Sequence, residues 1–340
     1  MRVTVLLGGT SSERDVSLAS GLRIAAALRA RGHEVYAVDT ARGALTIADE
    51  QAMLSGAIMK TLPPEQEALA RLTAETLSAT AGRLPQRGEA DVVFLGLHGG
   101  QGEDGTIQAL LDLTGVPYTG SGHLASALAM DKDLSKQLFR QAGVPTADWL
   151  MAPVTDEQVI AALGLPVIVK PSKQGSTVGL TLVKDAADIQ PAITEALRYD
   201  DEVMIERFIP GRELTVGILG DDALPVGEII PAHEIYDYEC KYTAGMAREE
   251  FPATLTAEGT RTLQDLSRRA FRALKLSGYA RIDFRMTEDG TFYCLEANTL
   301  PGMTELSLIP QAAAAAGIGF EALCDRIVQL AVARRQGESR

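Results

Sequence analysis

The sequence predicts an α/β domain with a parallel sheet at its N-terminus, followed by two domains of the α+β class. A β-α-β pattern opens the chain: a buried strand RVTVLL, a turn with two glycines, a helical pattern and a second strand HEVYAVD. Later segments show short strands in hairpins between helices, which favours antiparallel sheets. The length of 340 residues allows two or three domains.

We assign residues 1–120 to the first domain. Its later strand, DVVFLGLHGG, is apolar almost throughout, as expected for a parallel strand covered on both faces. The stretch from about 41 to 90 matches no motif, and its role is left open. The glycines of PYTGSG mark the boundary to the next domain.

The second domain is expected over residues 121–206 and the third over residues 207–340. In the second, strands LPVIVK and LTLVK flank a Gly-rich tip, PSKQGSTVG, and a helix near 186–198 precedes the strand EVMIERFI. In the third, strands ELTVGIL and LPVGEII precede a helix near 257–276 and the hairpin ARIDFRMTEDGTFYCLEAN. Both patterns are typical of α+β domains.

The composition narrows the function classes. A formal net charge of −13 disfavours partners such as nucleic acid or anionic lipid. Three cysteines without C-x-x-C spacing favour neither a disulfide framework nor a zinc site. The N-terminal apolar run is too short for a signal peptide, and no stretch approaches about 18 apolar residues. We therefore expect a cytoplasmic protein without membrane segments.

The hairpin of residues 281–298 carries polar groups on one face. Asp289 and Gly290 predict a two-residue type I′ turn, and this turn pairs Asp283 with Glu296. Alternation along both strands then separates a polar set from an apolar set: Arg281, Asp283, Glu296 and Asn298 against Ile282, Phe284 and Leu295.

Two carboxylates in directly opposed positions point to a cation. At a Cβ separation of about 5 Å, Asp283 and Glu296 repel each other unless a positive charge lies between them. Together with Asn298 they offer only oxygen ligands, and such ligands select a hard ion such as Mg²⁺, which commonly bridges carboxylates to phosphates.

A nucleotide cleft is suggested by two further segments. The Gly-rich tip lacks the spacing of a P-loop, but its backbone N–H groups can cover phosphates beside the fixed charge of Lys170. Lys132, within MDKDLSK, reads by itself as an exposed helix residue. The strand that ends at Glu206 enters a Pro-Gly turn, which frees backbone groups for an adenine edge, and Glu213 can accept bonds from ribose hydroxyls.

Eight blocks resemble one family in composition and order. They are LLGGTSSERDVSLASG, LHGGQGEDGTIQ, PYTGSG, MDKDLSK, KPSKQGSTVG, YDYECKY, GYARIDF and LEANTLPGMTELSLIP. Together they resemble the D-alanine:D-alanine ligases of the ATP-grasp superfamily over nearly the whole chain. The resemblance implies a three-domain ATP-grasp architecture in which a Rossmann-like domain precedes two α+β domains that hold ATP between them.

The resemblance also implies a reaction. ATP and two Mg²⁺ ions, with Mn²⁺ as a substitute, would activate one D-alanine as an acyl phosphate. The amine of a second D-alanine would attack it, giving a dipeptide for peptidoglycan together with ADP and phosphate. A homodimer in a bacterial cytoplasm is implied as well, with D-alanine and ATP as its small-molecule partners.

Roles for nucleotide and metal residues follow from the same resemblance. The metal ligands would be Asp283, Glu296 and Asn298. The phosphates would be held by Lys132, Lys170 and, at the terminal phosphate, Lys241. The adenine would contact Glu206, Arg207 and Ile209, and the ribose Glu213.

The resemblance assigns the amino-acid site likewise. Glu13 would bind the ammonium group of the first D-alanine and would be linked to Ser176 and Tyr242, with His98 near the substrate carboxylate. The oxyanion would face Arg281 and the backbone N–H of Gly302. The carboxylate of the second substrate would be held by Ser307 and the N–H of Leu308.

The alternatives are a depsipeptide ligase or another carboxylate-amine ligase of the ATP-grasp superfamily, an oxidoreductase and a nucleotide sensor. A depsipeptide ligase that joins D-alanine to D-lactate is distinguished by Tyr242, because a tyrosine there favours amide formation; its replacement by phenylalanine should loosen selectivity toward D-lactate. An oxidoreductase would need a dinucleotide fingerprint, but the first glycine turn lacks G-x-G-x-x-G and only Asp39 suggests a ribose contact. A nucleotide sensor without turnover would not need the complete set of oxyanion donors.

Overall fold

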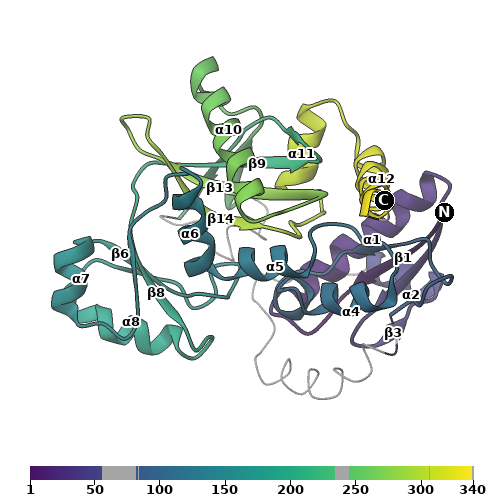
Figure 1. The fold of residues 1–340 in the computed structure, drawn as a ribbon, viewed down its shortest axis with the longest axis horizontal. Coiled ribbons are helices and arrows are strands. Elements are labelled where there is room, and N and C mark those ends of the chain that lie inside the picture. The colour runs from purple at the N-terminus through teal and green to yellow at the C-terminus, as the bar shows by residue number, and fades with distance from the viewer. Residues whose placement is uncertain (56–81, 83, 234–244, 306, 339–340) are drawn as a thin grey trace.

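The structure, a computed structural model, describes residues 1–55, 82, 84–233, 245–305 and 307–338. Three sheets organise the described chain, and the ribbon shows them as separate lobes that meet near the centre of the molecule (Figure 1). Two predicted site residues, Lys241 and Tyr242, lie outside the described residues, and so does Cys240.

The N-terminal sheet has the order β3-β2-β1-β4. Strand β1 (Arg2–Leu7) runs parallel to β2 (Glu34–Asp39) and to β4 (Val92–Leu95), which confirms the predicted parallel sheet. The short β3 (Gly43–Ala44) is an antiparallel edge. Five of the six residues of β1 are buried, because helices cover the sheet: α1 (Arg14–Ala30), α2 (Ile47–Ser55) and α4 (Thr106–Thr114) follow in chain order.

The second sheet is antiparallel, with the order β5-β8-β6-β7. Its strands are β5 (Trp149–Met151), β6 (Val167–Pro171), β7 (Thr181–Val183) and β8 (Val203–Arg207). Helices α7 (Asp156–Leu163) and α8 (Ile189–Ala196) contribute Val159 and Ile193 to its small core. In Figure 1 this unit forms the lobe on the left. The Gly-rich tip joins β6 to β7, as the sequence predicts.

The third sheet has the order β12-β11-β9-β13-β14, and β10 also pairs with β9. The strands are β9 (Arg212–Leu219), β10 (Asp222–Ala223), β11 (Gly227–Pro231), β12 (Ala247–Glu250), β13 (Tyr279–Met286) and β14 (Phe292–Asn298). Helix α10 (Ala257–Ala273) packs on it, and so do α5 (His123–Met130) and α6 (Lys132–Gln141), which precede the second sheet in the chain. The core of this unit therefore contains residues that precede the second sheet in the sequence as well as residues that follow it.

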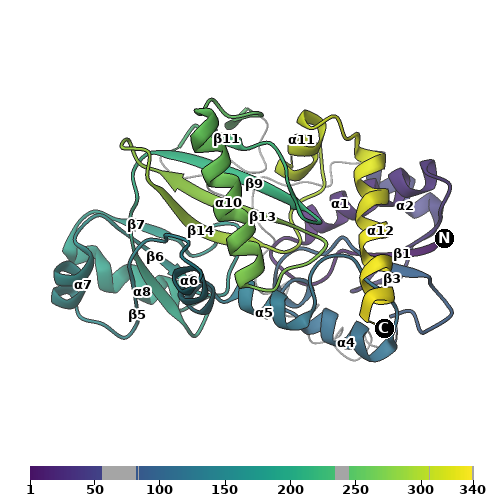
Figure 2. The ribbon, with the colours of Figure 1, turned by 45° about the horizontal axis from the view of Figure 1, so that its top comes forward.

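The C-terminal helices connect the third sheet to the first domain. Helix α11 (Leu308–Ala315) is followed by α12 (Phe320–Glu338), which packs against α1 and β4 and runs along the N-terminal domain (Figure 2). Leu323 and Ile327 of α12 share one buried core with Val3 and Val92 of the N-terminal sheet. The end of the chain thus completes the core at its beginning.

The hairpin of β13 and β14 has the predicted pairing but not the predicted turn. Asp283 lies opposite Glu296 as expected, whereas near the turn Met286 pairs with Phe292. Five residues therefore separate the strands, and the N–H of Thr287 donates to the oxygen of Thr291 at 3.0 Å. The two-residue turn was wrong because the left-handed Gly290 (φ +84°) closes a longer loop.

A β-bulge restores the pairing at the site. The register shifts by one residue between Asp283 and Phe284, where Leu295 is the extra residue on β14. The predicted place of Leu295 beside the core residues Ile282 and Phe284 was therefore wrong. The bulge turns it toward a pocket, and Cys294 takes the core position instead.

Within the described residues, no helix is both long enough and apolar enough to cross a membrane. Cys294 and Cys324 are buried free thiols, and burial raises the pKa of both. Raised thiol pKa values make them unreactive core residues.

Candidate functional site

Two adjoining pockets lie where the three sheets approach one another. The first, called the loop pocket here, lies between α1 and residues 298–308. The second, the sheet pocket, lies between the second and third sheets. Five residues line both pockets: Lys132, Gly175, Ser176, Arg281 and Glu296. A molecule in one pocket therefore reaches a molecule in the other.

A buried carboxylate between two lysines forms one wall of the sheet pocket. Lys170 Nζ lies 2.6 Å from Glu206 Oε2, and Lys136 Nζ donates to Oε1. Burial of Glu206 would raise its pKa, but the ammonium groups of Lys136 and Lys170 outweigh burial and lower it to about 2. Glu206 is therefore ionised at neutral pH, and the cluster carries a net positive charge.

The predicted adenine and ribose residues line the same pocket. Arg285 ties two of them together: its Nε donates to the backbone oxygen of Ile209 at 3.1 Å, and its guanidinium lies 3.2 Å from Glu213. Arg207 also lines the pocket, but its guanidinium donates to the backbone oxygen of Ala162 on α7.

The polar face of the hairpin lies between the two pockets. Asp283 accepts from Arg281 at 2.8 and 2.9 Å, from Asn298 Nδ2 at 2.9 Å and from Thr215 at 2.7 Å. Glu296, across the hairpin, lies 3.4 Å from Lys132 Nζ. Each carboxylate of this face is thus paired with a cation, Asp283 with Arg281 and Glu296 with Lys132, so the face is not simply a solvated surface.

This donor set fits a magnesium ion that keeps several waters. Asp283, Glu296 and Asn298 offer only oxygen ligands, and the rest of a magnesium shell is commonly water and phosphate. No cluster of three or more His, Cys, Asp or Glu side chains suited to a metal occurs among the residues that the structure describes. A site made by protein side chains alone, as for zinc, is therefore not found there.

The Gly-rich tip is held by α6 and by the residue that precedes α1. Lys132 Nζ donates to the backbone oxygen of Gln174 at 2.7 Å, and its side chain is buried rather than exposed. Ser176 Oγ donates to Glu13 Oε1 at 2.5 Å. Ser176 and Thr177 adopt positive φ angles of 50° and 59°, so these contacts hold a strained backbone in place.

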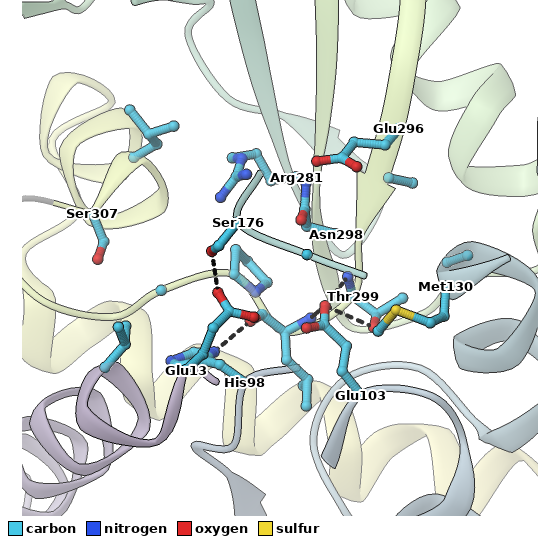
Figure 3. Close-up of a pocket in the computed structure, with 18 of the residues that line it drawn as sticks. Glu13, His98, Glu103, Met130, Ser176, Arg281, Glu296, Asn298, Thr299 and Ser307 are labelled. Carbon is cyan, nitrogen blue, oxygen red and sulfur yellow. Dashed lines mark hydrogen bonds between the residues drawn. The ribbon is translucent and has the colours of Figure 1, made fainter. Parts of the chain in front are cut away.

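In the loop pocket, buried side chains hold the segment after β14 (Figure 3). Glu103 accepts from the N–H groups of Thr299 and Leu300, each at 3.0 Å, and burial raises its pKa. His98 lines the pocket, but its Nδ1 lies 2.7 Å from the oxygen of Leu300 and its Nε2 lies 2.9 Å from Ser20 Oγ. Both ring nitrogens are therefore engaged within the protein.

The far wall of the loop pocket is the start of α11. Ser307 is the N-cap residue, and its Oγ accepts the N–H of Thr304 at 2.9 Å. A Cβ at Gly302 would lie 2.7 Å from this hydroxyl, so a larger residue there would displace it. Gly302, Ser307 and the first helical residue, Leu308, thus line one surface with the positive end of the helix dipole.

The structure brings together the described residues that the sequence singled out. One or both pockets are lined by Glu13, His98, Lys132, Lys170, Ser176, Glu206, Arg207, Ile209, Glu213, Arg281, Asp283, Glu296, Asn298, Gly302, Ser307 and Leu308. Sequence reasoning missed Ser20, Glu103 and Lys136. Asp39 is buried, and Arg14 occupies both of its oxygens, at 3.0 and 2.5 Å. Because it is fully enclosed and paired within the first domain, it is not presented to a dinucleotide ribose.

Comparisons with known proteins agree along the whole chain. Family models described as D-ala D-ala ligase N-terminus and C-terminus match residues 2–121 and 138–329. The D-alanine–D-alanine ligase of Geotalea uraniireducens is 44% identical over 97% of this chain and 95% of that protein, and that of Geobacter sulfurreducens 43% over 99% and 96%.

Solved structures give the same result. The D-alanine–D-alanine ligase from Coxiella burnetii has a TM-score of 0.81 at 30% identity, with 100% of this chain and 96% of that chain covered. The enzyme from Bacillus anthracis complexed with ATP has a TM-score of 0.76 at 32% identity, with 99% of each chain covered. The chain belongs to the D-alanine–D-alanine ligase family.

Proposed function

We propose that this protein is an enzyme that joins two D-alanine molecules into D-alanyl-D-alanine, a peptidoglycan precursor, with ATP converted to ADP and phosphate. The observation that carries the proposal is the shared wall of the two pockets. Lys132, Ser176, Arg281 and Glu296 line both. A triphosphate in the sheet pocket therefore ends next to a carboxylate held in the loop pocket.

The sheet pocket is proposed to bind ATP. The excess positive charge of the Lys136–Glu206–Lys170 cluster favours phosphates, and Lys132 lies beside the hairpin face. Adenine would contact Glu206, Arg207 and Ile209, and the ribose Glu213. Mg²⁺, for which Mn²⁺ can substitute, would neutralise phosphate charge when bound by Asp283, Glu296 and Asn298. Lys241, outside the described residues, is proposed to contact the terminal phosphate.

The loop pocket is proposed to bind the two amino acids. Glu13, fixed by its bond from Ser176, would hold the ammonium group of the first D-alanine. Tyr242, outside the described residues, would extend this link, and His98 would lie near the substrate carboxylate. Ser307 and the N–H of Leu308 at the start of α11 would hold the carboxylate of the second D-alanine.

The reaction then runs in two steps. An oxygen of the first carboxylate attacks the terminal phosphorus, and the bond to the leaving ADP breaks. The amine of the second D-alanine, after losing one proton to water, attacks the acyl carbon; as the carbon–oxygen bond to phosphate breaks, the nitrogen loses a second proton, which leaves with the phosphate. Arg281 and the N–H of Gly302 would face the oxyanion of the tetrahedral intermediate, which forms when the amine attacks and collapses when phosphate leaves. Such donors are each worth roughly 3 to 4 kcal/mol.

Phosphate release tests the activity. The purified protein is given ATP and Mg²⁺ with D-alanine, L-alanine, D-lactate together with D-alanine, or no amino acid, and the products are identified by mass. Release that requires D-alanine and yields the dipeptide is expected. Release without any amino acid would contradict the proposal, and a D-alanyl-D-lactate product that dominates at neutral pH would indicate the depsipeptide ligase instead.

The wider setting is proposed from the family. A homodimer in a bacterial cytoplasm, with domains over residues 1–120, 121–206 and 207–340 and without nucleic-acid or membrane partners, would fit a soluble biosynthetic ligase. Light scattering after gel filtration tests the dimer: a mass near twice 36.2 kDa is expected, and a mass near 36.2 kDa would contradict it.

A further inference from the structure

One hydroxyl group connects helix α1 to the loop pocket. Ser20 is fully buried on α1. Its Oγ lies 2.9 Å from His98 Nε2 and 3.1 Å from the backbone nitrogen of Met303. The two partners, His98 and Met303, lie 78 and 283 residues away from Ser20 along the sequence, so the contact exists only in the folded chain.

The directions of these hydrogen bonds follow from the chemistry of the groups. The carbonyl oxygen of Leu300 can only accept, so His98 Nδ1 carries the hydrogen and donates to it across 2.7 Å. In a neutral ring Nε2 is then an acceptor, which makes Ser20 the donor to it. The N–H of Met303 donates to the same hydroxyl oxygen. Burial supports the neutral ring because it lowers the pKa of His98, although the charge of Glu13 acts in the opposite direction.

The loop that carries Gly302 is thereby tied on both sides. His98 holds the oxygen of Leu300, and Ser20 holds the N–H of Met303. Gly302 lies between these two points in the chain and lines the loop pocket. Without the Ser20 hydroxyl, the second tie would be lost and His98 Nε2 would have no partner from α1.

We propose that Ser20 is a positioning residue of the ligase, which selects the Nδ1–H form of His98 and fixes the loop that presents the Gly302 N–H to the reaction centre. The inference rests on the proposed function for its kinetic consequence. Its structural part, the state of His98 and the order of the loop, does not depend on activity.

Ser20→Ala tests the kinetic part, with Ser17→Ala as a matched control. Ser17 lies one turn earlier on α1, is equally buried, and donates to the backbone oxygen of Gly96 at 2.7 Å rather than to His98. For Ser20→Ala we expect kcat to fall about 10- to 100-fold, the cost of a small misplacement at a reacting centre. The KM for ATP should stay within about twofold.

A conservative variant separates positioning from packing. Ser20→Cys keeps a weak donor and acceptor at the same place, so its kcat should lie between those of the wild type and Ser20→Ala. Equal kcat for Ser20→Ala and Ser17→Ala, or a Ser20→Cys rate no higher than that of Ser20→Ala, would overturn the proposal.

Two activity-independent measurements complete the test. Nitrogen-15 NMR of labelled histidine should show His98 with a protonated Nδ1 and a bare Nε2, and the Nε2 signal should move in Ser20→Ala only. Amide hydrogen exchange should become faster for a peptide that contains Met303 in Ser20→Ala but not in Ser17→Ala. A protonated Nε2 or unchanged exchange would overturn the inference. A wild type without D-alanine-dependent turnover would refute the proposed function and leave these two measurements to decide the inference.

Discussion

Different kinds of interaction stabilise the two pockets. The sheet pocket is lined by ion pairs: Glu206 lies between Lys136 and Lys170, and Glu213 pairs with Arg285. In the loop pocket, most contacts join a side chain to a backbone group or to a neutral partner. Figure 3 shows this arrangement around Glu103 and Thr299.

Because of this difference, substitutions in the two pockets should affect different properties of the enzyme. A buried charge that loses its partner costs about 3 to 5 kcal/mol, so a lesion in the sheet pocket should lower both stability and nucleotide affinity. A loop that loses one neutral hydrogen bond costs only about 1 kcal/mol, yet it moves donors away from the reacting atoms. Lesions in the loop pocket should therefore act mainly on rate.

The largest effect is expected where the pockets meet. Asp283→Asn removes a proposed magnesium ligand and the charge that Arg281 contacts, so activity should fall by about 100-fold or more. Asp289→Asn, at the exposed tip of the same hairpin, is the matched control and should keep wild-type activity. Steady-state kinetics across a magnesium titration measures both. Wild-type turnover by Asp283→Asn at ordinary magnesium levels would remove this residue from the metal site.

Glu206→Gln should act on the sheet pocket alone. Loss of the charge leaves two buried lysines without their shared partner, so we expect about 3 kcal/mol less stability and an increase of about 10-fold or more in the KM for ATP. The KM for D-alanine should change little. Glu228→Gln is the control, because Glu228 is also buried and paired, with Arg212 at 2.5 Å, but lines neither pocket. Glu228→Gln should be less stable than the wild type but should have an unchanged KM for ATP. An increase in this KM equal to that of Glu206→Gln would contradict the proposed role of the sheet pocket.

The pH dependence of stability sharpens the same point. The pKa of Glu206 is about 2 in the folded protein, below the ordinary value of 4.5, so the unfolded chain takes up the proton first as pH falls. The stability that this charge contributes is complete above pH 4.5 and declines as pH falls toward 2. Urea unfolding of wild type and Glu206→Gln from pH 6 to 3 should show the gap narrowing below about 4.5; a constant gap would contradict the assignment.

In the loop pocket, Ser176→Ala should act on the amino acid and not on the nucleotide. It removes the 2.5 Å bond to Glu13 and loosens the strained tip. We expect the KM for the first D-alanine to rise about 5- to 20-fold and the KM for ATP to change less than threefold. Thr194→Ala, on α8 of the same sheet unit, replaces a hydroxyl that bonds only within its helix and should be neutral. A larger change for ATP would reverse the proposed division of labour.

The sequence allowed the hairpin face to be predicted because strand alternation is local. Asp283 and Glu296 were paired correctly even though the turn was wrong, since the longer turn and the bulge at Leu295 shift the register in opposite directions. Neither feature has a strong local signal. An Asp-Gly pair such as Asp289 and Gly290 fits hairpin loops of several lengths. The bulge depends on how β14 packs on its neighbours.

Residues that act across domains could not be predicted in this way. Ser20, Glu103 and Lys136 stand in ordinary helix or loop positions, and their partners lie far along the chain. Lys132 shows the same limit: its helix pattern suggested an exposed side chain, whereas the Gly-rich tip covers it. Burial that comes from domain packing is not encoded in the periodicity of one segment.

The smallest effect should come from the edge of the sheet pocket. Glu213→Gln keeps the size of the side chain but removes the charge beside Arg285 and weakens the proposed bond to the ribose. We expect the KM for ATP to rise about 3- to 10-fold, in line with one charge-assisted hydrogen bond. The KM for 2′-deoxy-ATP should rise less, because that nucleotide lacks one of the hydroxyls. Comparing the two nucleotides with wild type, Glu213→Gln and Glu228→Gln isolates this contact: equal increases for both nucleotides would mean that Glu213 supports the pocket wall through Arg285 and does not contact the 2′-hydroxyl.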